Sequence, residues 1–130
     1  MRRLTGLFKA LSDETRLQML GLLLKKGELC VCDFVEVLQI TQSKASRHLR
    51  HLVNAGLLDD RREAVWVFFR IADRPGPAQA ELLQLLPRLL AARVPAELFD
   101  RLERWSRRKA GSGACRTAGA ADLSRAGAAR

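Results

Sequence analysis

The chain has 130 residues, and its 23 Lys and Arg against 14 Asp and Glu give a formal net charge of +9 at neutral pH. This length fits one compact domain with a single hydrophobic core and leaves no room for a separate catalytic domain. The positive excess favours a polyanionic partner, of which nucleic acid is the commonest in a cytoplasm.

No apolar run approaches the roughly 18 residues that a membrane-spanning helix needs. The basic start at Met1 is followed too soon by charged Lys9, Asp13 and Glu14 for a signal peptide. We therefore expect a cytoplasmic protein with no membrane partner. In that compartment, three cysteines indicate metal-binding or reactive thiols rather than a disulfide framework.

Apolar spacing predicts a first helix over residues 4–11. Ser12 is a candidate N-cap for a second helix, whose first turn carries Asp13 and Glu14 and which closes at Gly27 after two lysines. Its leucine content predicts that this second helix is buried core.

Two short helices with a tight link follow, which is the pattern of a helix-turn-helix. The first begins near Cys32 or Asp33 and extends for about two turns to Ile40. Thr41 caps the second, over residues 42–56, which buries the apolar residues Ala45, Leu49, Leu52 and Val53.

The exposed face of that second helix carries side chains that suit base edges and phosphates: Gln42, Ser43, Lys44, Ser46, Arg47 and His48. The plainer interpretation is a solvated helix face. His48 and His51 could also bind a metal, but they have no nearby carboxylate or thiol partner in sequence. We therefore predict that this face reads double-stranded DNA.

Residues 57–60 and 64–71 are predicted as two strands of a hairpin, or wing, joined by a polar turn at Arg61, Arg62 and Glu63. Arg61 and Arg62 would then lie at the tip of the hairpin, where they could contact a phosphate backbone.

Leucines over 80–90 predict a further helix, kinked or broken at Pro87, and Pro95 begins a final helix carrying Leu98, Leu102 and Trp105. Residues 1–110 form the predicted DNA-binding and dimerisation domain, and 111–130 a disordered basic Gly/Ala-rich tail. The first and last helices have more apolar surface than one chain can cover, which indicates a homodimer. The predicted fold is therefore mainly α with a small β-hairpin: a winged helix-turn-helix whose N- and C-terminal helices form the dimer.

Cys30 and Cys32 lie two residues apart where a helix is predicted to begin, and the positive end of a helix dipole stabilises thiolates. Thiolate pairs select soft ions, among them trivalent arsenic and antimony, cadmium, lead and copper(I). Residues two apart on a helix point roughly 200° away from each other, whereas on an extended segment they lie on the same side. Both sulfurs can therefore hold one ion only if the first turn stays open or unwinds. Cys115, in the tail, is either a third ligand or a spare thiol.

Three segments resemble the ArsR/SmtB family of bacterial winged-helix metalloregulators, in its arsenic-responsive branch: 8–17 (FKALSDETRL), 28–33 (ELCVCD) and 41–49 (TQSKASRHL) followed by Ala55-Gly56-Leu57. The resemblance covers roughly residues 4–72, and ELCVCD is its most specific part. It implies a non-enzymatic dimeric repressor of an arsenic-resistance operon. Arsenite or antimonite would act as inducer at Cys30 and Cys32, with no organic cofactor.

The sequence departs from several arsenic repressors at Val35, where they have a third cysteine. A three-sulfur site would therefore need Cys115 from either subunit, and two thiolates would also suit a methylated arsenical. Cadmium or lead sensing and thiol redox sensing stay open as alternatives. A thiol enzyme would need a base near Cys30 or Cys32, whereas both histidines lie on the predicted DNA face.

Overall fold

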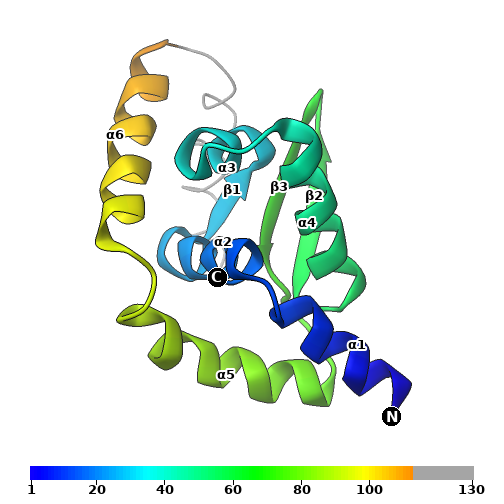
Figure 1. The fold of residues 1–130 in the computed structure, drawn as a ribbon. Coiled ribbons are helices and arrows are strands. Elements are labelled where there is room, and N and C mark those ends of the chain that lie inside the picture. The colour runs from blue at the N-terminus through cyan, green and yellow to red at the C-terminus, as the bar shows by residue number, and fades with distance from the viewer. Residues whose placement is uncertain (113–130) are drawn as a thin grey trace.

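A computed structural model describes residues 1–112, which form six helices and one three-stranded antiparallel sheet (Figure 1). In chain order the elements are α1 (Arg2–Leu11), α2 (Glu14–Lys26), β1 (Glu28–Cys30), α3 (Val31–Leu38), α4 (Gln42–Asn54), β2 (Leu58–Glu63), β3 (Trp66–Ile71), α5 (Pro77–Ala91) and α6 (Ala96–Ser112). The predicted winged helix-turn-helix is confirmed, with α3 and α4 as its two helices and β2 and β3 as the wing.

The helix-turn-helix is held by ordinary capping and by a buried apolar face. The Thr41 hydroxyl accepts a hydrogen bond from the backbone N–H of Lys44 at 3.1 Å and so caps α4, as predicted. Leu49 and Leu52 of α4 are fully buried together with Phe34 of α3. The angle between the two helices is therefore set by one shared core.

One boundary of α2 differs from the prediction and the other confirms it. Asp13, rather than Ser12, is the N-cap of α2, because its carboxylate accepts from the backbone N–H of Arg16 at 3.0 Å. Gly27 does end α2, with φ of 96°, a conformation that glycine adopts without strain.

The sheet has one strand more than the hairpin predicted from sequence. β1 pairs antiparallel with β3, so that Cys30 lies opposite Phe68, and the strand order is β1-β3-β2. The predicted turn at Arg61–Glu63 is wrong: these residues belong to β2, and the hairpin reverses at Ala64 and Val65.

The C-terminal helices enclose the core from two sides. α5 continues through Pro87 without a break, so of the predicted kink or break the break is wrong; proline leaves one helix carbonyl without its N–H donor. α6 packs along α3, on the side away from α4 (Figure 1). Cys115 and the predicted tail after residue 112 lie outside the described residues. Within 1–112, no helix is both long and apolar enough to cross a membrane.

Candidate nucleic-acid interface and dithiol site

The predicted reading face of α4 lies at the surface. Five of its side chains are exposed, namely Gln42, Ser43, Lys44, Ser46 and Arg47. The guanidinium of Arg47 donates to the Ser43 hydroxyl at 3.2 Å, one helical turn away. These side chains lie on the first turns of α4, the end of a recognition helix that contacts base edges in helix-turn-helix proteins.

His48 is held differently from its neighbours. It is half-buried, and its Nδ1 lies 3.0 Å from Nη1 of Arg16 on α2. Because a guanidinium can only donate, Nδ1 accepts and the proton of the neutral ring lies on Nε2. Burial lowers the pKa of His48, and the charges of Arg16, Lys44 and Arg47 lower it further, while Asp13 opposes them.

This environment predicts a loss of stability in mild acid. Because the folded pKa of His48 lies below 6.5, the unfolded chain takes up the proton more readily. The contribution of His48 is complete above pH 6.5 and is lost as the pH falls below that value. The free energy of unfolding, measured in urea between pH 7 and 5, should therefore fall more steeply in the wild type than in His48→Gln. Parallel profiles would contradict this assignment.

Arg61 has a structural role that the sequence did not reveal. Its guanidinium donates twice to the carboxylate of Glu28, at 2.9 and 2.8 Å, and once to that of Glu63 at 3.1 Å. It also lies over the ring of Phe68, 4.6 Å from the ring centre. Glu28 is buried, so this pair joins β1 to the wing.

Replacing Arg61 with glutamine should destabilise the protein by about 2 kcal/mol, because the buried Glu28 carboxylate would lose its cation; partial exposure of Arg61 keeps the effect below that of a fully buried pair. Arg62→Gln is the matched control, since Arg62 is exposed on the same strand and its loss should cost less than about 0.5 kcal/mol. Urea unfolding measures both, and equal stabilities of the two variants would overturn the role given to Arg61.

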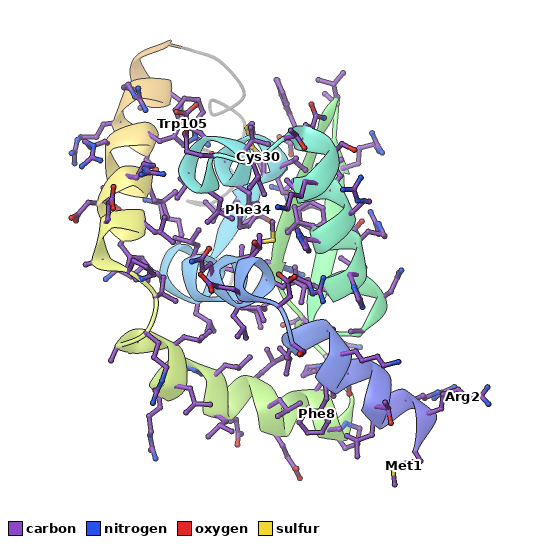
Figure 2. The ribbon with its side chains drawn as sticks, viewed as in Figure 1. Met1, Arg2, Phe8, Cys30, Phe34 and Trp105 are labelled. Atoms are coloured by element: carbon purple, nitrogen blue, oxygen red, sulfur yellow. A yellow bond between two sulfur atoms is a disulfide. The ribbon has the colours of Figure 1, made fainter. Side chains whose placement is uncertain are left out.

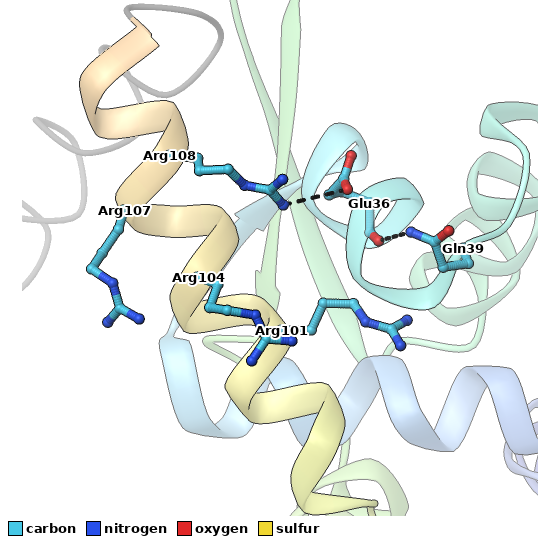
Figure 3. A pocket seen from close by; sticks show the side chains of 6 residues that line it. All are labelled: Glu36, Gln39, Arg101, Arg104, Arg107 and Arg108. Atoms are coloured by element: carbon cyan, nitrogen blue, oxygen red, sulfur yellow. Dashed lines mark hydrogen bonds and ion pairs between the residues drawn. The ribbon is translucent and has the colours of Figure 1, made fainter.

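Positive charge extends beyond the helix-turn-helix. Four arginines of α6 line an open hollow together with Glu36 and Gln39 of the α3 end: Arg101, Arg104, Arg107 and Arg108 (Figure 3). Gln39 lies in the turn just before α4. The basic surface of α6 therefore adjoins the turn that leads into the candidate reading helix.

Cys30 and Cys32 are brought together at the start of α3, where they form a disulfide with their Cα atoms 5.4 Å apart. Both sulfurs lie within 4.8 Å of a carboxylate oxygen of Asp33, which makes this cluster a candidate metal site among the described residues. Cys30 is 1% exposed and Cys32 is half-buried, so the pair is reached from the side of Cys32.

Opening of the first helical turn by a bound ion stays a prediction, and Cys30 already lies outside the helix. It is the N-cap of α3, with extended backbone angles (φ −94°, ψ 169°), and only Cys32 lies in the first turn. Cys30 and Asp33 form a reciprocal capping box, in which the Cys30 sulfur accepts from the Asp33 backbone and the Asp33 carboxylate from the Cys30 backbone. The sulfurs therefore meet while α3 keeps its first turn.

The cysteine pair contacts the wing directly. Cys30 packs against Phe68 of β3, and Cys32 and Trp66 pack around the same small cluster. Because Trp66 is the first residue of β3, next to the turn of the wing, the dithiol site adjoins both the wing and the helix-turn-helix.

Three residues around the dithiol had no functional role in the sequence prediction. Asp33 is 3% exposed, and one of its carboxylate oxygens accepts from Trp105 Nε1 at 2.8 Å and from Lys109 Nζ. Trp105 lies on α6 and points toward α3, beside the end that carries Cys30 (Figure 2). The only local sign of a role for Asp33 was its position three residues after the N-cap, where an acidic side chain can complete a capping box. No local pattern could reveal partners that lie more than 70 positions away.

Comparison with known proteins shows which family this chain resembles. Residues 13–60 match the model of the arsR family of bacterial regulatory proteins. The arsenic resistance transcriptional regulator ArsR1 of Pseudomonas putida is 48% identical over 64 residues, which are 49% of this chain and 50% of the relative. The arsenical resistance operon repressor of Escherichia coli is 52% identical over 66 residues, 51% of this chain and 56% of the relative.

A cadmium resistance regulator, the CadC homolog of Staphylococcus aureus, is 42% identical over 66 residues, covering 51% of this chain and 54% of that protein. This chain therefore spans about half the length of these curated relatives.

Solved structures extend the similarity over more of the chain. HlyU from Vibrio cholerae is 35% identical and has a TM-score of 0.57, with 68% of this chain and 91% of that one covered. The homodimeric winged helix-turn-helix domain of Mb0332 from Mycobacterium bovis is 29% identical with a TM-score of 0.58, over 73% and 84%. The antimony-specific repressor AntR is 29% identical with a TM-score of 0.54, over 68% and 78%.

Proposed function

Because this chain belongs to the ArsR family of bacterial regulatory proteins, we propose that it is a homodimeric repressor of an arsenic-resistance operon. Trivalent arsenic or antimony would release it from operator DNA by binding Cys30 and Cys32. The observation that carries this proposal is the meeting of two cysteine sulfurs at the start of α3, against the wing. As a repressor that binds operator DNA, the protein would act in the cytoplasm.

The DNA surface would combine α4 with the wing. Side chains on the first turns of α4 suit base edges, and Arg62 on β2 suits phosphate. His48 would reach DNA only through Nε2, since Nδ1 is bonded to Arg16. Arg61 is not part of this proposal, because its guanidinium is committed to Glu28 and Glu63.

The sequence predicted the first and last helices as the dimer surface, but the large apolar side chains that are exposed favour α1 and α5 instead. The large apolar side chains exposed on these helices are Leu4, Phe8, Leu85 and Leu89, and Phe8 is 54% exposed. Burying such a surface against its copy places two reading helices about one DNA turn apart, roughly 34 Å, and predicts a palindromic operator. The neighbour from Mycobacterium bovis, which is a homodimer, supports dimer formation itself.

Inducer binding would act on DNA affinity through two adjoining contacts. A soft ion on the Cys30 sulfur draws on the same lone pairs that cap the Asp33 N–H at the start of α3. It must also fit against Phe68 and Trp66 of the wing. If the ion prefers one arrangement of α3 and the wing and DNA prefers another, each ligand lowers the affinity for the other by the same factor.

The two thiolates leave the third position of trivalent arsenic open. Cys115, outside the described residues, or an external ligand would fill it, and a methylated arsenical would need neither. Cadmium or lead is the alternative inducer, and similarity to the Staphylococcus aureus cadmium regulator favours testing it.

A redox-sensing repressor is the second candidate function, and the Cys30–Cys32 disulfide favours it. In that case an oxidant takes two electrons and two protons from the dithiol and closes the same pair of sulfurs without an ion.

One titration tests both candidates. An operator duplex, selected from random sequences by the fully reduced protein, is labelled, and the complex is titrated with arsenite, antimonite, methylarsenite, cadmium, lead and zinc, and separately with peroxide. Release by the arsenicals and antimonite, with zinc inactive, is the expected result. Release by peroxide alone supports the redox function, and failure to select any duplex would overturn the DNA-binding proposal.

A further inference from the structure

The buried carboxylate of Asp33 links the dithiol to the C-terminal helix. One oxygen, Oδ2, accepts from the backbone N–H of Cys30 at 2.8 Å. The other, Oδ1, accepts from the Trp105 indole and the Lys109 ammonium, both on α6. A carboxylate that is 3% exposed needs such partners, since burial without them is costly. The two α6 donors therefore fix the orientation in which Oδ2 meets Cys30.

The hydrogen bond to Cys30 matters because of the backbone conformation that it supports. Were residue 30 helical, its side chain would point roughly 200° away from that of Cys32. The capping box keeps Cys30 extended, and only then does its sulfur lie beside that of Cys32. In the structure a disulfide joins the two sulfurs, and in the reduced protein whatever fixes the Asp33 carboxylate would help to keep them side by side.

α6 is attached along the whole length of α3. At the C-terminal end of α3, Arg101 donates to the backbone carbonyl of Val37 at 2.8 Å. In the middle, Arg108 lies 3.6 Å from the carboxylate of Glu36. At the N-terminal end, Trp105 and Lys109 reach Asp33. All four α6 residues lie outside the segment 13–60 that matches the family model.

We propose that Trp105 and Lys109 are positioning residues of the dithiol site. Through these two residues α6 contributes to inducer binding. By holding Asp33 they keep the Cys30 and Cys32 sulfurs in the arrangement that closes on one soft ion. The inducer part of this inference rests on the proposed function, whereas the arrangement of the sulfurs does not.

The variants distinguish three effects: loss of a hydrogen bond to Asp33, loss of the positive charge of Lys109, and general detachment of α6 from α3. Trp105→Phe removes one hydrogen bond to Asp33 without changing charge, Lys109→Met removes the ammonium, and Lys109→Arg restores a cationic donor. Arg101→Gln is the matched control, because it frees the other end of α3 and leaves Asp33 untouched. Urea unfolding of each variant verifies that it is folded.

Two measurements on the reduced protein, both without DNA, test the inference. The first is arsenite affinity by equilibrium dialysis. The second is the equilibrium of the dithiol with glutathione disulfide, which yields the protein disulfide and two glutathione thiols and reports how readily the two sulfurs meet. Trp105→Phe and Lys109→Met should each weaken arsenite binding about tenfold, as loss of a supporting residue does at other metal sites, and shift the glutathione equilibrium toward dithiol. Lys109→Arg should recover most of both losses.

Wild-type values in both Trp105→Phe and Lys109→Met would overturn the inference, as would an equal loss in Arg101→Gln. The outcome is independent of the proposed function: if arsenite fails to bind the wild type, the inducer proposal fails, while the glutathione equilibrium still decides whether Trp105 and Lys109 position the sulfurs.

Discussion

Replacing Cys30 or Cys32 with serine should leave operator affinity within about twofold of wild type and raise the arsenite needed for release more than about 100-fold, since a lost ligand costs more than a lost supporting residue. Serine suits the Cys30 position because its hydroxyl is a strong N-cap and can keep the capping box with Asp33. Fluorescence anisotropy of a labelled operator measures both quantities.

The Cys115→Ser variant shows whether two or three thiolates bind arsenite. An unchanged arsenite response in that variant assigns binding to the pair alone, and a partial loss adds Cys115 as the third ligand. Normal release of the Cys30→Ser complex by arsenite would exclude the site.

Placing a charge on the apolar face shared by α1 and α5 should separate the dimer. Phe8→Glu combined with Leu89→Glu is expected to give a monomer whose operator affinity falls at least about 100-fold, because each chain then binds only one half-site. Both side chains are partly exposed in the single chain, so the substitutions should spare its core.

Sedimentation velocity gives the mass of the species, and circular dichroism verifies the fold. Val65→Glu is the control for association, since this exposed valine lies in the turn of the wing, away from α1 and α5. A stable dimer of Phe8→Glu/Leu89→Glu with wild-type operator affinity would place the interface elsewhere.

Local signals sufficed for most of the helices. Thr41 followed by apolar residues at helical spacing located α4, and Gly27 located the end of α2, because caps and helical periodicity depend only on neighbouring residues. The position of the wing was predicted, but its turn was placed three residues too early. Charged Arg61 and Arg62 suggested a turn, whereas the chain continues in β2 because Arg61 pairs with Glu28 of β1.

The parts that were missed depend on contacts distant in sequence. Three residues are too few for a strand pattern, and β1 exists only because it pairs with β3 some 40 residues later. This pairing and the capping box with Asp33 together hold Cys30 extended, outside α3. Trp105 was predicted only as an apolar residue of the last helix, whereas its indole N–H donates a hydrogen bond to Asp33.

Coupling between the dithiol and the DNA surface is most directly measured by comparing arsenite affinity in the free dimer and in the operator complex, both fully reduced. Reciprocal linkage requires that operator DNA weaken arsenite binding by the same factor by which saturating arsenite weakens operator binding, typically about 5- to 150-fold. We expect two equal factors in that range. Identical arsenite affinities with and without DNA would mean that Cys30 and Cys32 do not control the DNA contacts.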